Sequence, residues 1–131
     1  MVGNMHGVFH WNELRARDVE KAKKYYSDLL GWTYEEVRME EDGSLYYLCK
    51  SGDQIVAGMF EMNEQTGFPP EVPSHWLPYI EVDDVDKCLE IAKNEGSEIY
   101  FGPMDVKDVG RFAVVLDGAG AVVGLITPAK C

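Results

Sequence analysis

The chain lacks the long apolar runs and paired cysteines that mark several classes of protein. No uninterrupted apolar stretch reaches the roughly 18 residues of a membrane span, and the start MVGNMHG has no signal-peptide pattern. We therefore expect a cytoplasmic protein with no membrane partner. Its cysteines, Cys49, Cys88 and Cys131, form no CxxC pair, so neither a disulfide framework nor a zinc knuckle is indicated.

Basic charge and common catalytic motifs are also scarce. Twelve Lys and Arg residues against twenty-three Asp and Glu residues give a net charge of −11, which would repel a phosphate backbone. Nucleic acid is therefore not an expected partner. The sequence has no GxSxG, P-loop or GxGxxG motif, so nucleophilic hydrolysis, nucleotide hydrolysis and dinucleotide binding have no support. Its 131 residues, 46% of them hydrophobic, suffice for one compact domain.

An internal repeat is the most informative feature that is present. DVEKA at 18–22 is followed 66 positions later by DVDKC at 84–88. Asp18 and Asp84 suit the N-cap of a helix, where a side-chain oxygen accepts from a backbone N–H group. The same offset of 66 pairs Tyr46 with Phe112, Leu48 with Val114, Gly58 with Gly124 and several further positions. The alignment needs no gap from the helix start to the last strand.

Each half of the repeat predicts a strand, a helix and then three strands. The elements fall at about 8–16, 18–30, 32–39, 44–51 and 54–62, then at about 76–82, 84–95, 98–105, 110–117 and 121–127. The Pro-rich segment EQTGFPPEVPS at 64–74 predicts an extended linker. We expect one α+β domain of two βαβββ modules, at about 7–63 and 75–128. The modules are predicted to form an open barrel-like cleft with the helices outside.

The paired modules, with WNELRARDVEKAKKYYSDLLGW and VGRFAVVLDGAGAVVGL, resemble the vicinal oxygen chelate superfamily. This superfamily includes glyoxalase I, bleomycin-resistance proteins and extradiol dioxygenases, and it also contains metal-free binders. The resemblance implies metal ligands on the first and last strand of each module, at positions held here by Trp11, Gly58, Leu77 and Gly124. None of these side chains can coordinate a divalent ion. We therefore expect no metal and no cofactor.

The predicted cleft is lined by aromatic and charged side chains. Strand alternation places Trp11, Glu13 and Arg15 on the cleft side, and His10 on the other side as a packed structural histidine. Gly58 and Gly124 are expected to leave room beneath a ligand. The predicted ligand contacts are Trp11, Glu13, Arg15, Tyr46, Gly58, Met59, Leu77, Tyr79, Glu81, Arg111 and Gly124, with Leu48 as a further candidate.

Two carboxylates are candidates for catalysis. Glu13 lies in an otherwise apolar strand, where an unpaired charge is costly, so it forms an ion pair with Arg15 or Arg111 or contacts a ligand. Glu13 and Glu81 could each serve as a general base.

Three functions remain open on the sequence. The first, which we favour, is a metal-free module that binds a small hydrophobic or aromatic molecule. The second is a metal-dependent lyase or isomerase of the glyoxalase type, with an unusual ligand set of Glu13, Glu81 and a histidine. The third is a structural protein whose cleft is filled by its own side chains. Because open sheet edges need cover, we also expect a homodimer.

Overall fold

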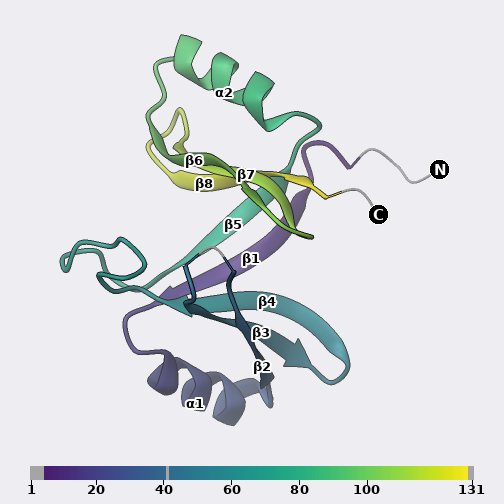
Figure 1. Ribbon diagram of the computed structural model, residues 1–131, viewed down its shortest axis with the longest axis vertical. Coiled ribbons are helices and arrows are strands. Elements are labelled where there is room, and N and C mark those ends of the chain that lie inside the picture. Colours follow the sequence, from purple (N-terminus) through teal and green to yellow (C-terminus); the bar gives the residue numbers. More distant parts are fainter. Residues whose placement is uncertain (1–4, 41, 130–131) are drawn as a thin grey trace. The chain divides into compact units, whose positions relative to one another are not determined.

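The computed structural model describes residues 5–40 and 42–129, which fall into two compact units. The first unit is Trp11–Leu77, and the second unit joins residues 5–10 to residues 78–129. The elements in order are β1 Phe9–Ala16, α1 Val19–Leu30, β2 Thr33–Arg38, β3 Leu45–Ser51, β4 Gln54–Glu61, β5 His75–Glu81, α2 Val85–Asn94, β6 Ile99–Val106, β7 Gly110–Leu116 and β8 Val122–Pro128 (Figure 1). Every predicted element is present with its ends within one residue of the prediction, and the α+β class is confirmed. No helix in the described residues is long and apolar enough to cross a membrane.

In the first unit the strands lie in the order β2, β3, β4 and β1. β3 is antiparallel to β2 and β4, whereas β4 runs parallel to β1. The side chain of Asp18 accepts from the backbone N–H of Lys21, and Gly31 ends α1 at a φ of 76°. The core of this unit joins Val19 of the helix to the alternate strand residues Leu14, Ala16, Tyr47, Cys49, Ala57 and Met59.

In the second unit the order is β5, β8, β7 and β6, again with one parallel pair, β5 with β8. Asp84 caps α2 by accepting from the backbone N–H of Lys87. The pairing register follows the repeat, because Glu13 lies opposite Gly58 in the first unit and Tyr79 lies opposite Gly124 in the second. The core of this unit comprises Val82, Val85, Leu89, Ala113 and Val115.

The segment 64–74, which its prolines predict to be an extended linker, begins with a turn. Its first residues form a turn in which Thr66 and Asn63 exchange hydrogen bonds, and the backbone N–H of Phe68 donates to the carbonyl of Asn63 at 3.1 Å. Side-chain bonds to the backbone hold this turn, and the proline content of the segment does not reveal them.

Candidate functional site

A chain of hydrogen bonds crosses the face of the first sheet that lies opposite α1. The indole N–H of Trp11 donates to the Tyr46 hydroxyl at 3.0 Å, and that hydroxyl donates to Glu13 Oε2 at 2.9 Å. Glu13 Oε1 accepts from Arg15 Nε at 3.1 Å. Alternation along β1 thus brings together the three residues predicted to share a face, and Tyr46 joins them from β3. The ion pair of Glu13 is made with Arg15, one of the two partners considered.

Aromatic rings enclose this polar chain. Glu13 and Arg15 are only 8% and 9% exposed. The Arg15 guanidinium carbon lies 5.6 Å from the ring centroids of both Phe60 and Phe68, within the range of cation–π attraction. Phe60 also stacks against Tyr46 at 6.4 Å. Its position on β4, opposite both Arg15 and Tyr46, explains why it reaches this face.

Arg17 fixes the segment that carries Phe68. Its Nε donates to the carbonyl of Val72 at 2.8 Å, one terminal nitrogen donates to the carbonyl of Met62 at 3.3 Å, and the other donates to the carbonyl of Pro69. A guanidinium presents several donors in a rigid fork, so one side chain can hold three carbonyl groups at once. Arg17 therefore holds the segment that places the Phe68 ring against Arg15.

Gly58 and Gly124 do not leave room for a ligand. A Cβ atom at Gly58 would lie 1.8 Å from the Tyr46 hydroxyl, and one at Gly124 would lie 2.3 Å from the Tyr79 ring. The expectation is wrong because each glycine lets a tyrosine of its own unit lie flat across the sheet. In the second unit the ring of Tyr79, which is 5% exposed, contacts Phe112 edge to face at 6.0 Å.

Met59 and Arg111 do not face the expected side. Met59 is 1% exposed within the core that packs on α1. Its side chain therefore points to the other face of β4 from Gly58 and Phe60. Arg111 donates to both carboxylate oxygens of Asp86 on α2 and to Asp105 on β6. Leu77 is also buried, at 1% exposure.

His10 is not a packed histidine. Its side chain is 38% exposed, and its Nδ1 lies 3.1 Å from Glu81 Oε1. The prediction fails because the first two residues of β1 are exposed, whereas continuous burial along the strand begins at Glu13. Glu81, the second candidate base, is thereby paired with a histidine.

Comparison with known proteins identifies the family. The family model of the Glyoxalase/Bleomycin resistance protein/Dioxygenase superfamily matches residues 8–125. The chain belongs to this superfamily. The likeness to the vicinal oxygen chelate proteins is therefore confirmed.

Relatives within the superfamily include longer proteins. "Putative glyoxylase CFP32" of Mycobacterium tuberculosis is 33% identical over 119 residues, which cover 91% of this chain and 45% of that protein. "Anthracycline biosynthesis protein DnrV" of Streptomyces peucetius is 31% identical over 128 residues and 88% of this chain, again 45% of the relative. The chain spans about half the length of the curated relatives it matches.

Solved structures show the same fold. Methylmalonyl-CoA epimerase from Mycobacterium tuberculosis has a TM-score of 0.67 at 16% identity, covering 99% of this chain and 94% of the epimerase. The Y257F variant of homoprotocatechuate 2,3-dioxygenase from B. fuscum has a TM-score of 0.61 at 15% identity, covering 98% of this chain and 35% of the dioxygenase.

The metal site of the glyoxalase superfamily does not fit the residues of this chain. The positions at which the resemblance implies metal ligands hold Trp11, Gly58, Leu77 and Gly124. The space at the two glycines is taken by tyrosine rings, and the Trp11 N–H is a donor that already bonds to Tyr46. Within residues 5–40 and 42–129, no group of three or more His, Cys, Asp and Glu side chains is placed to hold a metal ion.

Proposed function

We propose that this glyoxalase-superfamily chain binds a small, flat aromatic molecule without a metal, on the face that carries Trp11, Glu13, Arg15 and Tyr46. The observation that carries the proposal is the hydrogen-bonded chain from Trp11, which is partly buried, to the buried pair of Glu13 and Arg15. A buried ion pair is a weak source of stability compared with apolar side chains of the same size. Its presence beneath aromatic rings is better explained by recognition of a ligand.

Each part of this face has a role in binding. Aromatic walls with a few placed polar groups are typical of small-molecule sites. The rings of Trp11 and Tyr46 would contact the flat part of the ligand, while Arg15 would donate to its oxygen atoms and Glu13 would accept from a hydroxyl group. The name of the relative DnrV assigns that protein to anthracycline biosynthesis, and anthracyclines are flat aromatic compounds. The relative's name therefore agrees with the ligand class.

Thermal melting in the presence of a chelator tests this function. The ligand panel is benzoate, 2-naphthoate and anthraquinone-2-carboxylate, with cyclohexanecarboxylate as the non-aromatic control. We expect the melting temperature to rise with the aromatic area of the ligand and not with the control. The rise should disappear in Trp11→Leu and persist in Tyr47→Phe, which alters the helix side of the same sheet. No rise with any aromatic compound, or an equal rise in Trp11→Leu, would contradict the proposal.

A glyoxalase-type lyase or isomerase reaction is the second candidate function. Its support is the 2.9 Å bond from the Tyr46 hydroxyl to Glu13, since a carboxylate beside an O–H group can take up and return a proton. If this function holds, Glu13→Gln abolishes turnover of the hemithioacetals that methylglyoxal forms with thiols but retains aromatic binding. Turnover that depends on added Zn²⁺, Ni²⁺ or Mn²⁺ would favour the metal-dependent form.

We also propose that the chain forms a homodimer. β2 and β6 each pair with one strand, and five of the six residues of β2 are exposed. Open edges of this kind invite pairing, and a second copy would cover them. Light scattering at micromolar concentration should return twice the mass of one chain, and the mass of a single chain would refute the dimer.

A further inference from the structure

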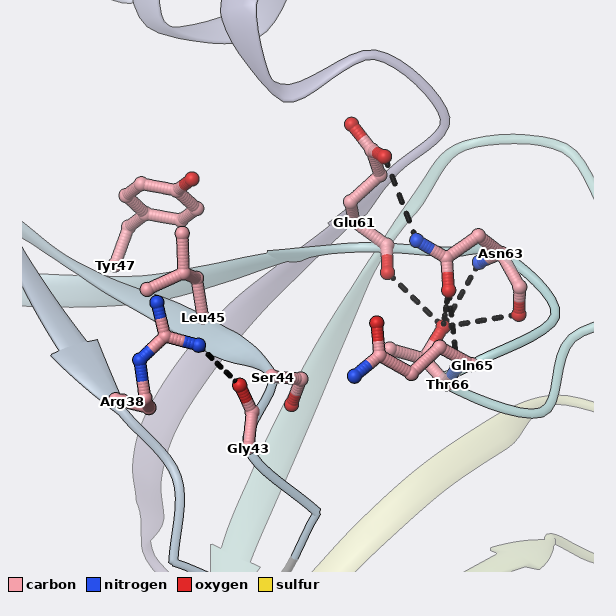
Figure 2. Close-up of a pocket in the computed structure, with 9 residues that line it drawn as sticks. All are labelled: Arg38, Gly43, Ser44, Leu45, Tyr47, Glu61, Asn63, Gln65 and Thr66. Carbon is pink, nitrogen blue, oxygen red and sulfur yellow. Dashed lines mark hydrogen bonds between the residues drawn. The ribbon is translucent and has the colours of Figure 1, made fainter.

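A separate hollow of about 270 Å³ lies on the first unit, away from the aromatic face. It is lined by Arg38, Gly43, Ser44, Leu45, Tyr47, Glu61, Asn63, Gln65 and Thr66 (Figure 2). Arg38 and Tyr47 stand on one side of it, and Glu61, Asn63 and Gln65 stand on the other (Figure 2). No residue predicted to contact the aromatic ligand lines it. At this volume the hollow has room for a small polar molecule.

The Tyr47 hydroxyl is the unusual feature of this hollow. Tyr47 is 7% exposed, yet within the described residues its hydroxyl has no hydrogen-bond partner. Every fully buried side-chain oxygen or nitrogen in the same residues does have one, so this hydroxyl is not fully buried, and Tyr47 lines the hollow. Burial, followed by the carboxylates of Glu36, Glu20 and Glu61, raises the pKa of Tyr47. The hydroxyl therefore stays protonated at neutral pH, where it can both donate and accept.

Groups of opposite charge stand on the two sides of the hollow. Arg38 donates one terminal N–H to the carbonyl of Gly43 at 2.6 Å, and a guanidinium has five N–H donors in all. Glu61 accepts from the backbone N–H of Val19 and from the side-chain amide of Asn63, both at 3.4 Å. These two bonds are long for N–H···O contacts, so the carboxylate retains strong capacity to accept.

We infer that this hollow binds a small zwitterion that carries one carboxylate and one amine, in the manner of a free amino acid. The guanidinium of Arg38 would hold the carboxylate in the bidentate geometry that suits it. The amine would donate to Glu61. The Tyr47 hydroxyl, which stands on the same side of the hollow as Arg38, would form a further hydrogen bond to the same molecule (Figure 2). A neutral zwitterion also fits a chain with a net charge of −11, because it brings no net charge to be repelled.

Titrations monitored through backbone amide chemical shifts test this site. The probes are glycine, β-alanine and 4-aminobutyrate, in which the amine and the carboxylate stand progressively farther apart. Acetate and methylammonium serve as the two halves tested alone. We expect one zwitterion to give saturable shifts at the amides of Ser44, Gln65 and Thr66, while either half gives much weaker binding.

Substitutions in the hollow should weaken that probe selectively. Arg38→Gln and Glu61→Gln each remove a charged partner, which predicts a loss of about tenfold or more in affinity. Tyr47→Phe removes a neutral hydrogen bond, which predicts roughly a fivefold loss. Glu35→Gln is the matched control, because Glu35 lies on β2, pairs with Lys50 and does not line the hollow.

Two outcomes would overturn the inference. One is no saturable shift at about 20 mM of any zwitterion, a concentration well above the dissociation constant of even a weak ligand near 1 mM. The other is an equal loss of affinity in Glu35→Gln, which would mean that binding follows surface charge alone. Neither outcome bears on the aromatic face, because Tyr47 and Tyr46 point to opposite faces of β3.

Discussion

Tyr46→Phe and Tyr47→Phe should have very different effects on stability, although the two residues are neighbours on β3. Tyr46→Phe removes the hydroxyl that accepts from Trp11 at 3.0 Å and donates to Glu13 at 2.9 Å. A neutral hydrogen bond contributes about 1 kcal/mol and one to a charged group about 1.5–3 kcal/mol, so the loss should be about 2–4 kcal/mol. Tyr47→Phe removes a hydroxyl without a described partner and should change stability by less than about 0.5 kcal/mol.

Urea denaturation measures both variants directly. With an m-value of about 2 kcal/mol/M, the midpoint of Tyr46→Phe should fall by roughly 1–2 M while that of Tyr47→Phe stays near the wild type. The m-values should be equal, which shows that the folded states are equally compact. Midpoints of the two variants that agree within about 0.2 M would refute the hydrogen-bonded chain from Trp11 to Glu13 as a source of stability.

Three further predictions concern other parts of the structure. Arg17→Lys keeps the charge but loses the forked guanidinium that holds three carbonyl groups. The protease Glu-C should therefore cut the segment 64–74 of the native protein faster in this variant. An unchanged rate of cleavage would contradict the role of Arg17. Gly124→Ala should cost about 1–3 kcal/mol, because its Cβ would meet the Tyr79 ring at 2.3 Å, whereas Gly118→Ala, with nothing within 4 Å, should be nearly neutral in the same thermal melts. Equal costs would mean that Tyr79 moves aside freely. Burial raises the pKa of the Cys49 thiol from 9.0 to about 11, so the folded state holds this proton more tightly than the unfolded state does. The free energy of unfolding should therefore fall as the pH rises from 9 to about 11. Cys49→Ala should remove that part of the pH dependence, and an identical slope in both proteins would contradict it.

The repeat in the sequence predicts the elements because their signals are local. Asp18 and Asp84 act as the N-caps that their positions indicate. The same local rules also give the correct faces of two residues, Met59 and Arg111, that the predicted ligand contacts place on the wrong face. Met59 is adjacent to Gly58, so alternation cannot place both on one face, and Phe60 is the residue that shares the face of Gly58. Likewise the offset of 66 pairs Tyr46 with Phe112, so Phe112 lies on the face of its sheet that corresponds to the face of Tyr46. Its neighbour Arg111 therefore points to the other face, towards the helix.

Other features of the site depend on side-chain placement, which local sequence does not specify. A glycine within a strand indicates a close approach but does not show that the approaching group is a tyrosine of the same unit. The contact of Phe68 with Arg15 requires the fold of the segment 64–74, and that fold depends on Arg17, more than fifty positions from Pro69 and Val72. Likewise, the exposure of His10 depends on where burial of β1 begins.

Calorimetric titration of anthraquinone-2-carboxylate tests metal-free binding to the face of Trp11, with the protein first in EDTA and then in excess Zn²⁺ or Ni²⁺. We expect saturable binding with the same dissociation constant under both conditions, since Trp11, Gly58, Leu77 and Gly124 supply no metal ligand. We also expect that Trp11→Leu abolishes the heat of binding. Binding that appears only with added metal, or no binding under either condition, would contradict a metal-free aromatic site on this face.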